Sequence, residues 1–275
     1  MLTGWNLDPL EISVLALVGA LYWRRALTLA RRGRPVPRAR IAAFATGLLT
    51  LFVALESPID TIGEERLFSV HMLQHLLLGD VGALLLVLGL DGRLLQPLLR
   101  IRLVQRLRFL AHPLVALPLW AVNFVAWHLP VLFDAALRND AIHALQHTSF
   151  VALGMLMWAA LLEPLPGPAW FTAPWKIPYV LGMWLVMLVL SQIFIWANHV
   201  YYAPYAHDAP LWGLTHLADQ KAGGGVMLVE SMFTMLPALV WVLLQVLRES
   251  EARQRLVEAG VAPAAAARAA RYGRA

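Results

Sequence analysis

The sequence of 275 residues contains no cysteine. That absence excludes disulfide bonds, thiolate metal sites and covalent haem attachment through a Cys-x-x-Cys-His motif. A metal ion held by this chain would need ligands from histidine, methionine, carboxylate or backbone groups. Charged residues are also scarce, at 14%, whereas hydrophobic residues make up 60%. Such a composition lies outside the range of an ordinary soluble domain and indicates a membrane protein.

Apolar runs in the sequence are long enough to be membrane-spanning helices, since a helix needs ~20 residues to cross a hydrocarbon layer of ~30 Å. The seven runs are residues 10–29, 41–55, 69–90, 113–133, 141–162, 177–199 and 223–247. The sequence therefore predicts an all-α, polytopic bundle of seven transmembrane helices. We divide the chain into a membrane domain, residues 1–247, and a basic, alanine-rich cytoplasmic tail, residues 248–275.

Lysine and arginine are distributed unevenly between the two ends of these runs. With the N-terminus outside, 19 of the 22 basic residues fall on the inner side, and Arg66, Arg138 and Lys221 fall outside. The positive-inside rule then predicts an outer N-terminus and a cytoplasmic C-terminus. The excess positive charge would face anionic membrane lipids. The sequence lacks the combined basic and aromatic groove typical of nucleic-acid binding, so we expect no nucleic-acid partner.

Histidines gather on the outer side of this predicted topology, where eight of the nine lie. Two pairs, His71/His75 and His143/His147, are spaced four residues apart. That spacing puts two imidazoles on one helix face with Cβ atoms ~6 Å apart, close enough to share a metal ion. A single histidine at a membrane interface is more often a water-bonded side chain than a metal ligand, so the hypothesis of a metal site rests on the two pairs. The candidate metal ligands are His71, His75, His128, His143, His147, His199 and Asp219. We interpret His207 and His216 as loop residues and His112 as an inner-side residue.

Two further side chains near these histidines have alternative interpretations. Asp219 precedes the last apolar run, where it would either stabilise the helix start or act as a ligand or as the acceptor for a ligand imidazole. Met72 lies ~100° round the helix from His71 and should face a neighbouring helix. Its thioether is therefore only a weak indication of Cu(I).

Asp80 is the only clear carboxylate that we place near the middle of the membrane. At ~100° per residue it points ~140° away from His75, so we do not expect it to join the same site. An intramembrane carboxylate is usually functional. It would relay protons or pair with a buried polar group such as Asn123 or Gln192.

Several short motifs follow one another along the chain. They are His71-Met72-Leu73-Gln74-His75, Trp127-His128-Leu129-Pro130, the paired His143 and His147, Tyr202-Ala203-Pro204-Tyr205 and Asp219-Gln220-Lys221-Ala222-Gly223. In this order they resemble the motifs of the CtaG family of cytochrome c oxidase assembly proteins, over roughly residues 48–247. The resemblance implies a seven-helix protein of the bacterial plasma membrane that helps to assemble haem–copper oxidases by handling copper at the outer face.

The residue pattern and the resemblance together predict a copper-handling accessory protein. It would bind copper as Cu(I) and pass it to an oxidase subunit by ligand exchange, so we do not expect an enzyme. The surplus of candidate ligands indicates either two metal positions or a transfer path. Two alternatives stay open, namely a membrane haem protein with axial histidines from different helices and a metal transporter.

Overall fold

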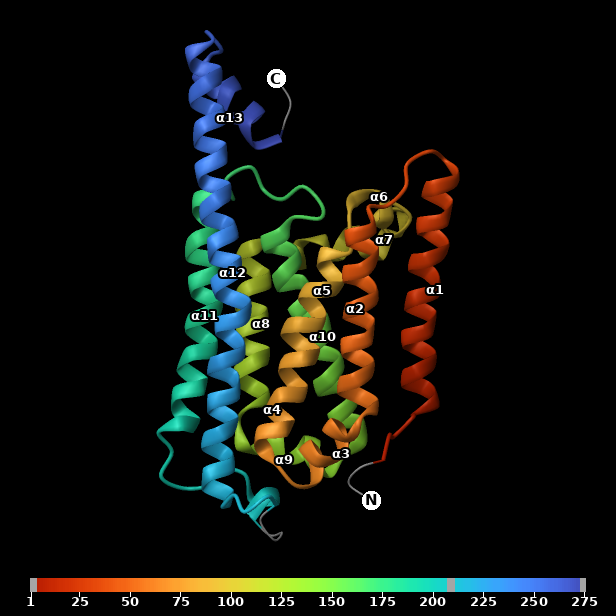
Figure 1. The fold of residues 1–275 in the computed structure, drawn as a ribbon, viewed down its shortest axis with the longest axis vertical. Coiled ribbons are helices and arrows are strands. Elements are labelled where there is room, and N and C mark those ends of the chain that lie inside the picture. Colours follow the sequence, from red (N-terminus) through yellow and green to blue (C-terminus); the bar gives the residue numbers. More distant parts are fainter. Residues whose placement is uncertain (1–3, 207–210, 273–275) are drawn as a thin grey trace.

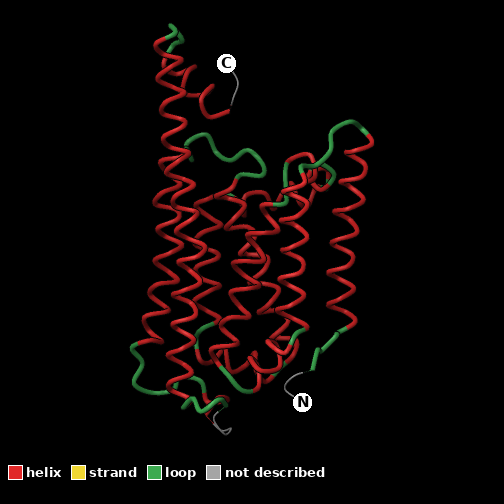
Figure 2. The backbone as a smooth tube through the Cα atoms, viewed as in Figure 1, coloured by secondary structure: helices red, strands yellow, loops and turns green. Residues whose placement is uncertain are grey.

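A computed structural model describes residues 4–206 and 211–272. Within these residues the chain is all-helical, without a strand (Figure 2). The long helices are α1 (Pro9–Arg31), α2 (Arg38–Glu56), α8 (Pro113–Trp127), α10 (Asp140–Leu162), α11 (Ala173–Ile195) and α12 (His216–Glu258). One further rod consists of α4 (Phe68–Leu76), the π-helix η1 (Leu77–Gly82) and α5 (Ala83–Leu88). Short helices join them: α3 (Pro58–Glu65), α6 (Gly92–Leu95), η2 (Leu98–Arg100), α7 (Arg102–Leu107), η3 (Arg108–Ala111), α9 (Pro130–Arg138), η4 (Ala203–Ala206) and α13 (Pro263–Tyr272).

The predicted all-α membrane bundle is confirmed. In the described part of the chain, six helical rods are long and apolar enough to cross a membrane. A seventh is obtained by joining α8 to the segment before it, from which it is bent by 80°. The predicted run 113–133 is too long: α8 ends at Trp127. Pro130 then begins the separate helix α9, because proline has no amide hydrogen and fits the first helical turn.

Polar side chains fix where several helices begin. The Asp8 carboxylate accepts hydrogen bonds from the Leu10 and Glu11 amides at the start of α1. The Asn139 side chain accepts from the first amides of α10, and the Thr215 hydroxyl accepts from an amide in the first turn of α12. Such caps satisfy amides that no helix carbonyl can reach. They fix the start of both α10 and α12 at the same end of the bundle.

The two ends of the bundle differ in charge and in the chain ends that they carry. Figure 1 places α3, α9 and the described N-terminal segment at one end, and α6, α7 and α13 at the other. The second end, which we call the basic end, holds the arginine-rich loops after α1 and α5. There Arg25 donates to the Arg93 carbonyl, and Arg40 donates to the carbonyls of Leu88 and Leu90. These bonds attach α1 and α2 to the loop that follows α5.

The rod α4–η1–α5 runs through the middle of the bundle and contacts α10 at very short range. A Cβ atom on Gly154 of α10 would lie 1.9 Å from the carbonyl oxygen of Gly79 in η1. The two backbones can therefore approach only because position 154 is glycine, and a Cβ on Gly79 would also be tight, at 3.1 Å from the Phe150 Cβ atom. By contrast, α1 lies at the edge, where Leu10 and Leu17 are 73% and 59% exposed, as suits a lipid-facing helix.

The C-terminal part continues directly from the bundle. Helix α12 has 43 residues and passes residue 247 without a break. At ~1.5 Å per residue it is ~65 Å long, well over the thickness of the hydrocarbon layer. Helix α13 folds back at the basic end (Figure 1), where Arg271 donates to the Glu163 carboxylate and to the Phe171 carbonyl. The tail is thus attached to the loop between α10 and α11.

Candidate metal centre

Five histidines are buried together at the end opposite the basic end. They are His71 and His75 on α4, His143 and His147 on α10, and His128 immediately after α8. None of them is more than 8% exposed. We call these five residues the histidine cluster. The structure thus brings both four-residue pairs together with the histidine that ends α8.

Three members of the cluster have ring nitrogens close enough together to share one metal ion. His71, His75 and His143 each offer a ring nitrogen, and these nitrogens all lie within 4.8 Å of one another. The ring centroids of His143 and His147 are 4.0 Å apart. The His75 ring lies 5.5 Å from that of His147 and 6.3 Å from that of His128. His75 is therefore shared between a first group with His71 and His143 and a second group with His147 and His128.

Most ring nitrogens in the cluster are buried without a well-directed hydrogen-bond partner. These atoms are Nδ1 and Nε2 of His71, Nδ1 and Nε2 of His75, and Nε2 of His128, His143 and His147. A buried polar atom left without a partner costs ~1–3 kcal/mol. Native structures hold few such atoms, so their concentration at one point marks this cluster as a candidate ligand site. Neutral imidazole nitrogens are ligands for copper, zinc, iron and nickel.

The second ring nitrogen of two cluster members is held by the surrounding protein. Nδ1 of His128 lies 2.6 Å from the Phe124 carbonyl oxygen, which can only accept. Nδ1 of His143 lies 2.7 Å from Oε1 of Glu64. In both residues the proton is therefore held on Nδ1 and the lone pair of Nε2 is available. Metal-ligating histidines show the same arrangement.

Acidic residues of α3 lie beside the cluster, and the sequence interpretation did not single them out. Glu64, with its side chain 35% exposed, connects His143 to the surface. One turn earlier, burial raises the pKa of Asp60 to about 7, and the negative charge of Glu64 adds to that shift. Oδ1 of Asp60 accepts a hydrogen bond from the Gln74 amide at 2.7 Å. The acidic pattern of residues 58–65, in a short segment between two apolar runs, is the sequence signal that could have indicated this role.

Asp219, on α12, contacts the first residues of α4 and is not among the groups that could share a metal ion with His71. Its carboxylate accepts hydrogen bonds from the Phe68 amide at 2.7 Å and from the Ser69 amide at 3.1 Å. It also accepts from the Ser69 hydroxyl. The carboxylate on α12 therefore stabilises the first turn of the helix that carries His71 and His75. Of the interpretations offered for Asp219, the structure supports helix stabilisation, although the helix concerned is α4 and not its own.

Aromatic residues of the loop before α12 cover the cluster. The Tyr202 hydroxyl donates to the His128 carbonyl at 2.8 Å, and the Tyr205 hydroxyl donates to the Gly63 carbonyl at 2.6 Å. Gly63 lies against His71, since an added Cβ would be 3.0 Å from the His71 Cα atom. The motif Tyr202-Ala203-Pro204-Tyr205 thus connects the loop to both groups of histidines.

Other histidines and Met72 lie outside the cluster. His199 is exposed in the loop after α11, where Nδ1 lies 2.7 Å from the Asn198 side chain. His216 begins α12, His112 caps α8 at the basic end, and His207 lies outside the described residues. Met72 is fully buried and faces Gly223 of α12, so its sulfur is directed at a neighbouring helix, as predicted.

Asp80 lies apart from the cluster, and its partners differ from those expected. Trp158 Nε1 donates to one carboxylate oxygen at 2.7 Å, and the Thr234 hydroxyl donates to the other at 3.0 Å. Asn123 and Gln192, the expected partners, accept instead from Trp127 and Trp196 on their own helices. Asp80 is also not the only intramembrane carboxylate, because Glu230 of α12 lies close enough to interact with it electrostatically. The sequence interpretation did not identify Glu230 as an intramembrane carboxylate, because its neighbours in the run 223–247 are apolar.

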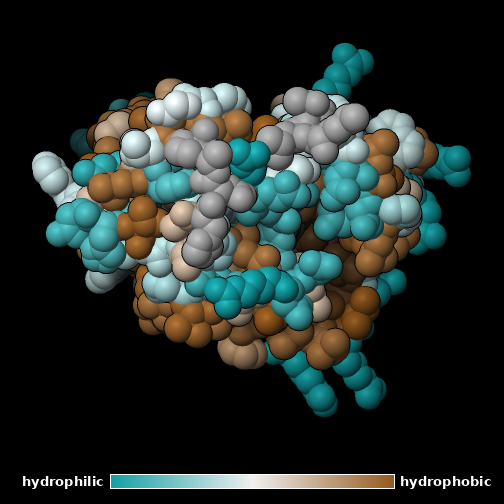
Figure 3. Space-filling view, turned by 90° about the horizontal axis from the view of Figure 1, so that it is seen from below, coloured by the Kyte–Doolittle hydropathy of each residue, from teal (hydrophilic) through white to brown (hydrophobic). Residues whose placement is uncertain are grey.

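The end face above the histidine cluster is largely hydrophilic. Figure 3 shows this end, with hydrophilic residues gathered across its centre and hydrophobic residues along part of its rim. A polar face surrounded by an apolar rim is typical of a membrane protein viewed from the aqueous side. Glu64, whose side chain is 35% exposed, is in contact with the buried His143 at this end.

Known proteins match this chain along most of its length. Residues 20–249 match the family described as cytochrome c oxidase caa3 assembly factor (Caa3_CtaG). Uncharacterized proteins of Mycobacterium bovis and Mycobacterium tuberculosis are each 27% identical over 246 residues, which cover 82% of this chain and 37% of theirs. An uncharacterized protein of Mycobacterium leprae is 27% identical over 206 residues, 68% of this chain and 30% of its own. The chain thus spans only about a third of the length of these relatives. No solved structure matches it. Because the family match covers most of the sequence, the chain belongs to the cytochrome c oxidase caa3 assembly factor family.

Proposed function

We propose that this protein binds copper at the histidine cluster and hands it to a subunit of a haem–copper oxidase. The observation that carries the proposal is the burial of five imidazoles with unpartnered nitrogens at one point, three of them within 4.8 Å of one another. The family's description as an oxidase assembly factor supports the same role. Copper is cargo in this proposal, so the chain acts by ligand exchange and not as an enzyme.

Cu(I) is the oxidation state that the pocket favours. The cost of burying an ion rises with the square of its charge, so a monovalent ion is easier to accommodate among neutral ligands. The cluster supplies neutral imidazoles, and the nearest carboxylate, Glu64, contacts His143 through Nδ1. Met72 is directed at Gly223, so thioether ligation adds nothing to the preference.

The two groups of histidines suggest a transfer path. The first group, His71, His75 and His143, includes the member next to the surface carboxylate Glu64. The second group shares His75 and adds His147 and His128. A copper ion could exchange one imidazole at a time, so that no step leaves it without ligands. Such exchange explains why the cluster contains more ligands than one ion needs.

Membrane orientation follows from the charge difference between the two ends. Most lysines and arginines lie at the basic end, which the positive-inside rule assigns to the cytoplasm and to anionic lipids. The histidine cluster would then face the outer side of a bacterial plasma membrane. An oxidase subunit that receives copper would dock on the hydrophilic face of Figure 3.

The haem alternative receives less support than copper. Axial ligation places one imidazole on each side of the iron with the macrocycle between them. The cluster rings instead lie 4.0 to 6.3 Å from their neighbours, and Phe133 and Phe150 fill the adjacent space. A single metal ion fits this spacing better.

Elemental analysis tests the proposal. The protein is purified, loaded with Cu(I) under reducing conditions and passed through a desalting column before copper is counted. We expect His75→Ala and His147→Ala to lose bound copper, because each removes a buried imidazole from the cluster. His199→Ala, which alters an exposed histidine of the adjacent loop, is the matched control and should keep the wild-type copper content. Full occupancy in both cluster variants would reject the assignment.

A further inference from the structure

Two carboxyl groups lie close together inside the membrane-spanning part of the bundle. Asp80 lies within η1, near the centre of the rod Phe68–Leu88, and is 4% exposed. Glu230 lies on α12, and both of its carboxyl oxygens are buried. Thr234, one turn along α12 from Glu230, donates to Asp80, and the carboxyl groups of Asp80 and Glu230 are close enough to interact electrostatically. Two adjacent carboxylates buried in a low-dielectric region would repel each other strongly, so we expect one of the two groups to hold a proton.

The surrounding donors indicate which group carries that proton. Both oxygens of Asp80 accept hydrogen bonds, one from Trp158 and one from Thr234. These donors stabilise Asp80 as the anion. The oxygens of Glu230 are instead buried without a well-directed hydrogen-bond donor. We therefore assign the proton to Glu230.

Among residues 4–206 and 211–272, no basic side chain interacts with this pair. From α12 the neighbours are Glu230 and the hydroxyl of Thr234, and from α10 the neighbour is the indole of Trp158. The pair therefore carries one negative charge and one proton between two acids. Removing that proton would place two negative charges side by side in a low-dielectric region, which is strongly unfavourable.

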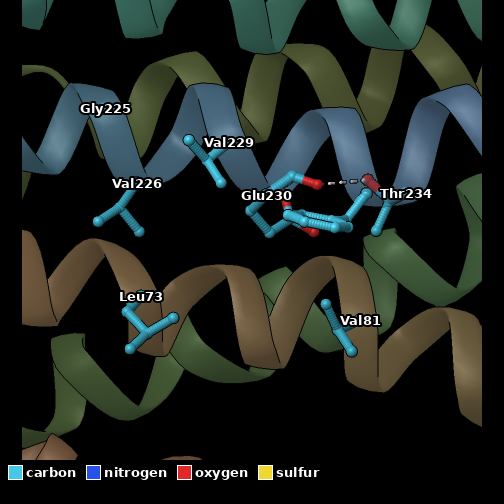
Figure 4. Close-up of a pocket in the computed structure, with 8 residues that line it drawn as sticks. Leu73, Val81, Gly225, Val226, Val229, Glu230 and Thr234 are labelled. Carbon is cyan, nitrogen blue, oxygen red and sulfur yellow. Dashed lines mark hydrogen bonds between the residues drawn. The ribbon is translucent and has the colours of Figure 1, made fainter.

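Two cavities connect the pair to its surroundings. The first, of about 470 Å³, lies between the α4–η1–α5 rod and α12 and is lined by Glu230, Thr234 and apolar side chains (Figure 4). Its residues Val229 and Phe233 are 53% and 77% exposed, so this cavity opens toward the lipid. Apolar molecules could reach Glu230 by this side.

The second cavity, also of about 470 Å³, leads to the basic end. It is lined at one side by Trp158 and Thr234, the two donors to Asp80, and at the other by Arg40, Asp91 and Glu163. Ala238 and Leu84 also line this cavity. A cavity of this size has room for water molecules, which need only two to four polar partners each. It therefore offers a water-accessible path between the pair and the basic end.

We propose that Asp80 and Glu230 form an intramembrane proton-binding site that exchanges its proton with the basic end through the second cavity. The rod that contains Asp80 also carries His71 and His75, and a π-helix, a feature found frequently at functional sites, interrupts the rod at Asp80. The site is separate from the histidine cluster and does not depend on copper binding.

Infrared spectroscopy of the protein in lipid nanodiscs tests the bound proton. We expect a protonated-carboxyl C=O band at neutral pH that shifts in D₂O and is lost in Glu230→Gln. Glu251→Gln, an exposed acid further along the same helix, should keep the band. His75→Ala should also keep it, so failure of copper binding and failure of this proposal are distinguishable. Absence of the band in the wild-type protein, or its survival in Glu230→Gln, would overturn the proposal.

Chemical labelling provides a second readout that needs only the wild-type fold. Dicyclohexylcarbodiimide takes the proton of a carboxylic acid on one of its nitrogens while the carboxylate oxygen bonds to its central carbon; rearrangement to an N-acylurea then retains the whole reagent. We expect Glu230 to be labelled from the lipid side at neutral pH, with the mass of the reagent added to its peptide. A wild-type protein in which Glu230 stays unlabelled would contradict a proton on that residue.

The path to the basic end is tested by filling the second cavity. Ala238→Phe should slow the exchange of the carboxyl proton for deuterium at least several-fold. Val240→Phe, on the same helix and 54% exposed, is the control and should exchange at the wild-type rate. Equal exchange rates in the wild type and Ala238→Phe would reject the path.

Discussion

Nδ1 of His143 lies 2.7 Å from Oε1 of Glu64, although 79 positions separate the two residues in the chain. The contact joins α3, at the membrane surface, to α10 in the bundle. It fixes the ring of His143 with Nε2 directed away from Glu64. A carboxylate in this position also makes the opposite nitrogen a stronger electron donor.

Replacing Glu64 should therefore weaken copper binding without removing a ligand. We expect Glu64→Gln to keep the wild-type copper content at saturation but to bind ~10–100-fold more weakly, the usual effect of losing such a carboxylate. Competition with a Cu(I) chelator of known affinity measures the change. Glu65→Gln, the exposed neighbour on the same helix, serves as the control. Equal weakening in both variants would show that only the local charge matters.

The sequence was sufficient for features that repeat along one helix. Apolar runs predicted the membrane rods, and the spacing of His71 and His75 predicted a shared face, because both depend on the geometry of a single helix. The Glu64–His143 contact depends on how two distant helices pack, and no periodicity in either segment encodes it. The π-helix at Asp80 likewise has no pattern in the sequence. The intramembrane position of Glu230 was not predicted, because a hydropathy average over a long apolar run changes little when it includes one acidic residue.

Asp219 should matter for the stability of α4. The two carboxylate oxygens accept from different amides, so in Asp219→Asn the side-chain nitrogen would face either the Phe68 or the Ser69 amide, and that hydrogen bond would be replaced by two opposed donors. Loss of a helix cap costs about 1 kcal/mol, and an unsatisfied buried donor adds ~1–3 kcal/mol. We expect a lower midpoint of thermal unfolding in detergent and weaker copper binding, since α4 carries His71 and His75.

The matched control for Asp219 is Asp140→Asn, in the exposed first turn of α10. It changes the same charge at another helix start but leaves α4 untouched. A thermal midpoint for Asp219→Asn equal to that of Asp140→Asn would mean that the bridge between α12 and α4 contributes little.

The close approach of α10 to η1 predicts an unusually sensitive glycine. In Gly154→Ala the new methyl group would lie 1.9 Å from the Gly79 carbonyl oxygen, so the helices must separate. Overpacking of this kind costs ~1–3 kcal/mol or more. Gly225→Ala is the control, because a Cβ there meets no atom within 4 Å. Thermal unfolding should distinguish the two, and a similar midpoint for both variants would contradict the packing described here.

Asp60 should make copper affinity depend on pH near neutrality. Burial raises the pKa of Asp60 to about 7, so the carboxyl is neutral below that pH and anionic above it. Because Asp60 interacts electrostatically with His143, the anion attracts a cation at the cluster and the neutral acid does not. Affinity for Cu(I) should therefore rise between pH 6 and 8, beyond the change caused by histidine deprotonation. In Asp60→Asn this component should disappear, while the Glu65→Gln protein should retain it. Chelator competition at a series of pH values measures the difference, and identical pH profiles for the wild type and Asp60→Asn would exclude a role for this carboxyl.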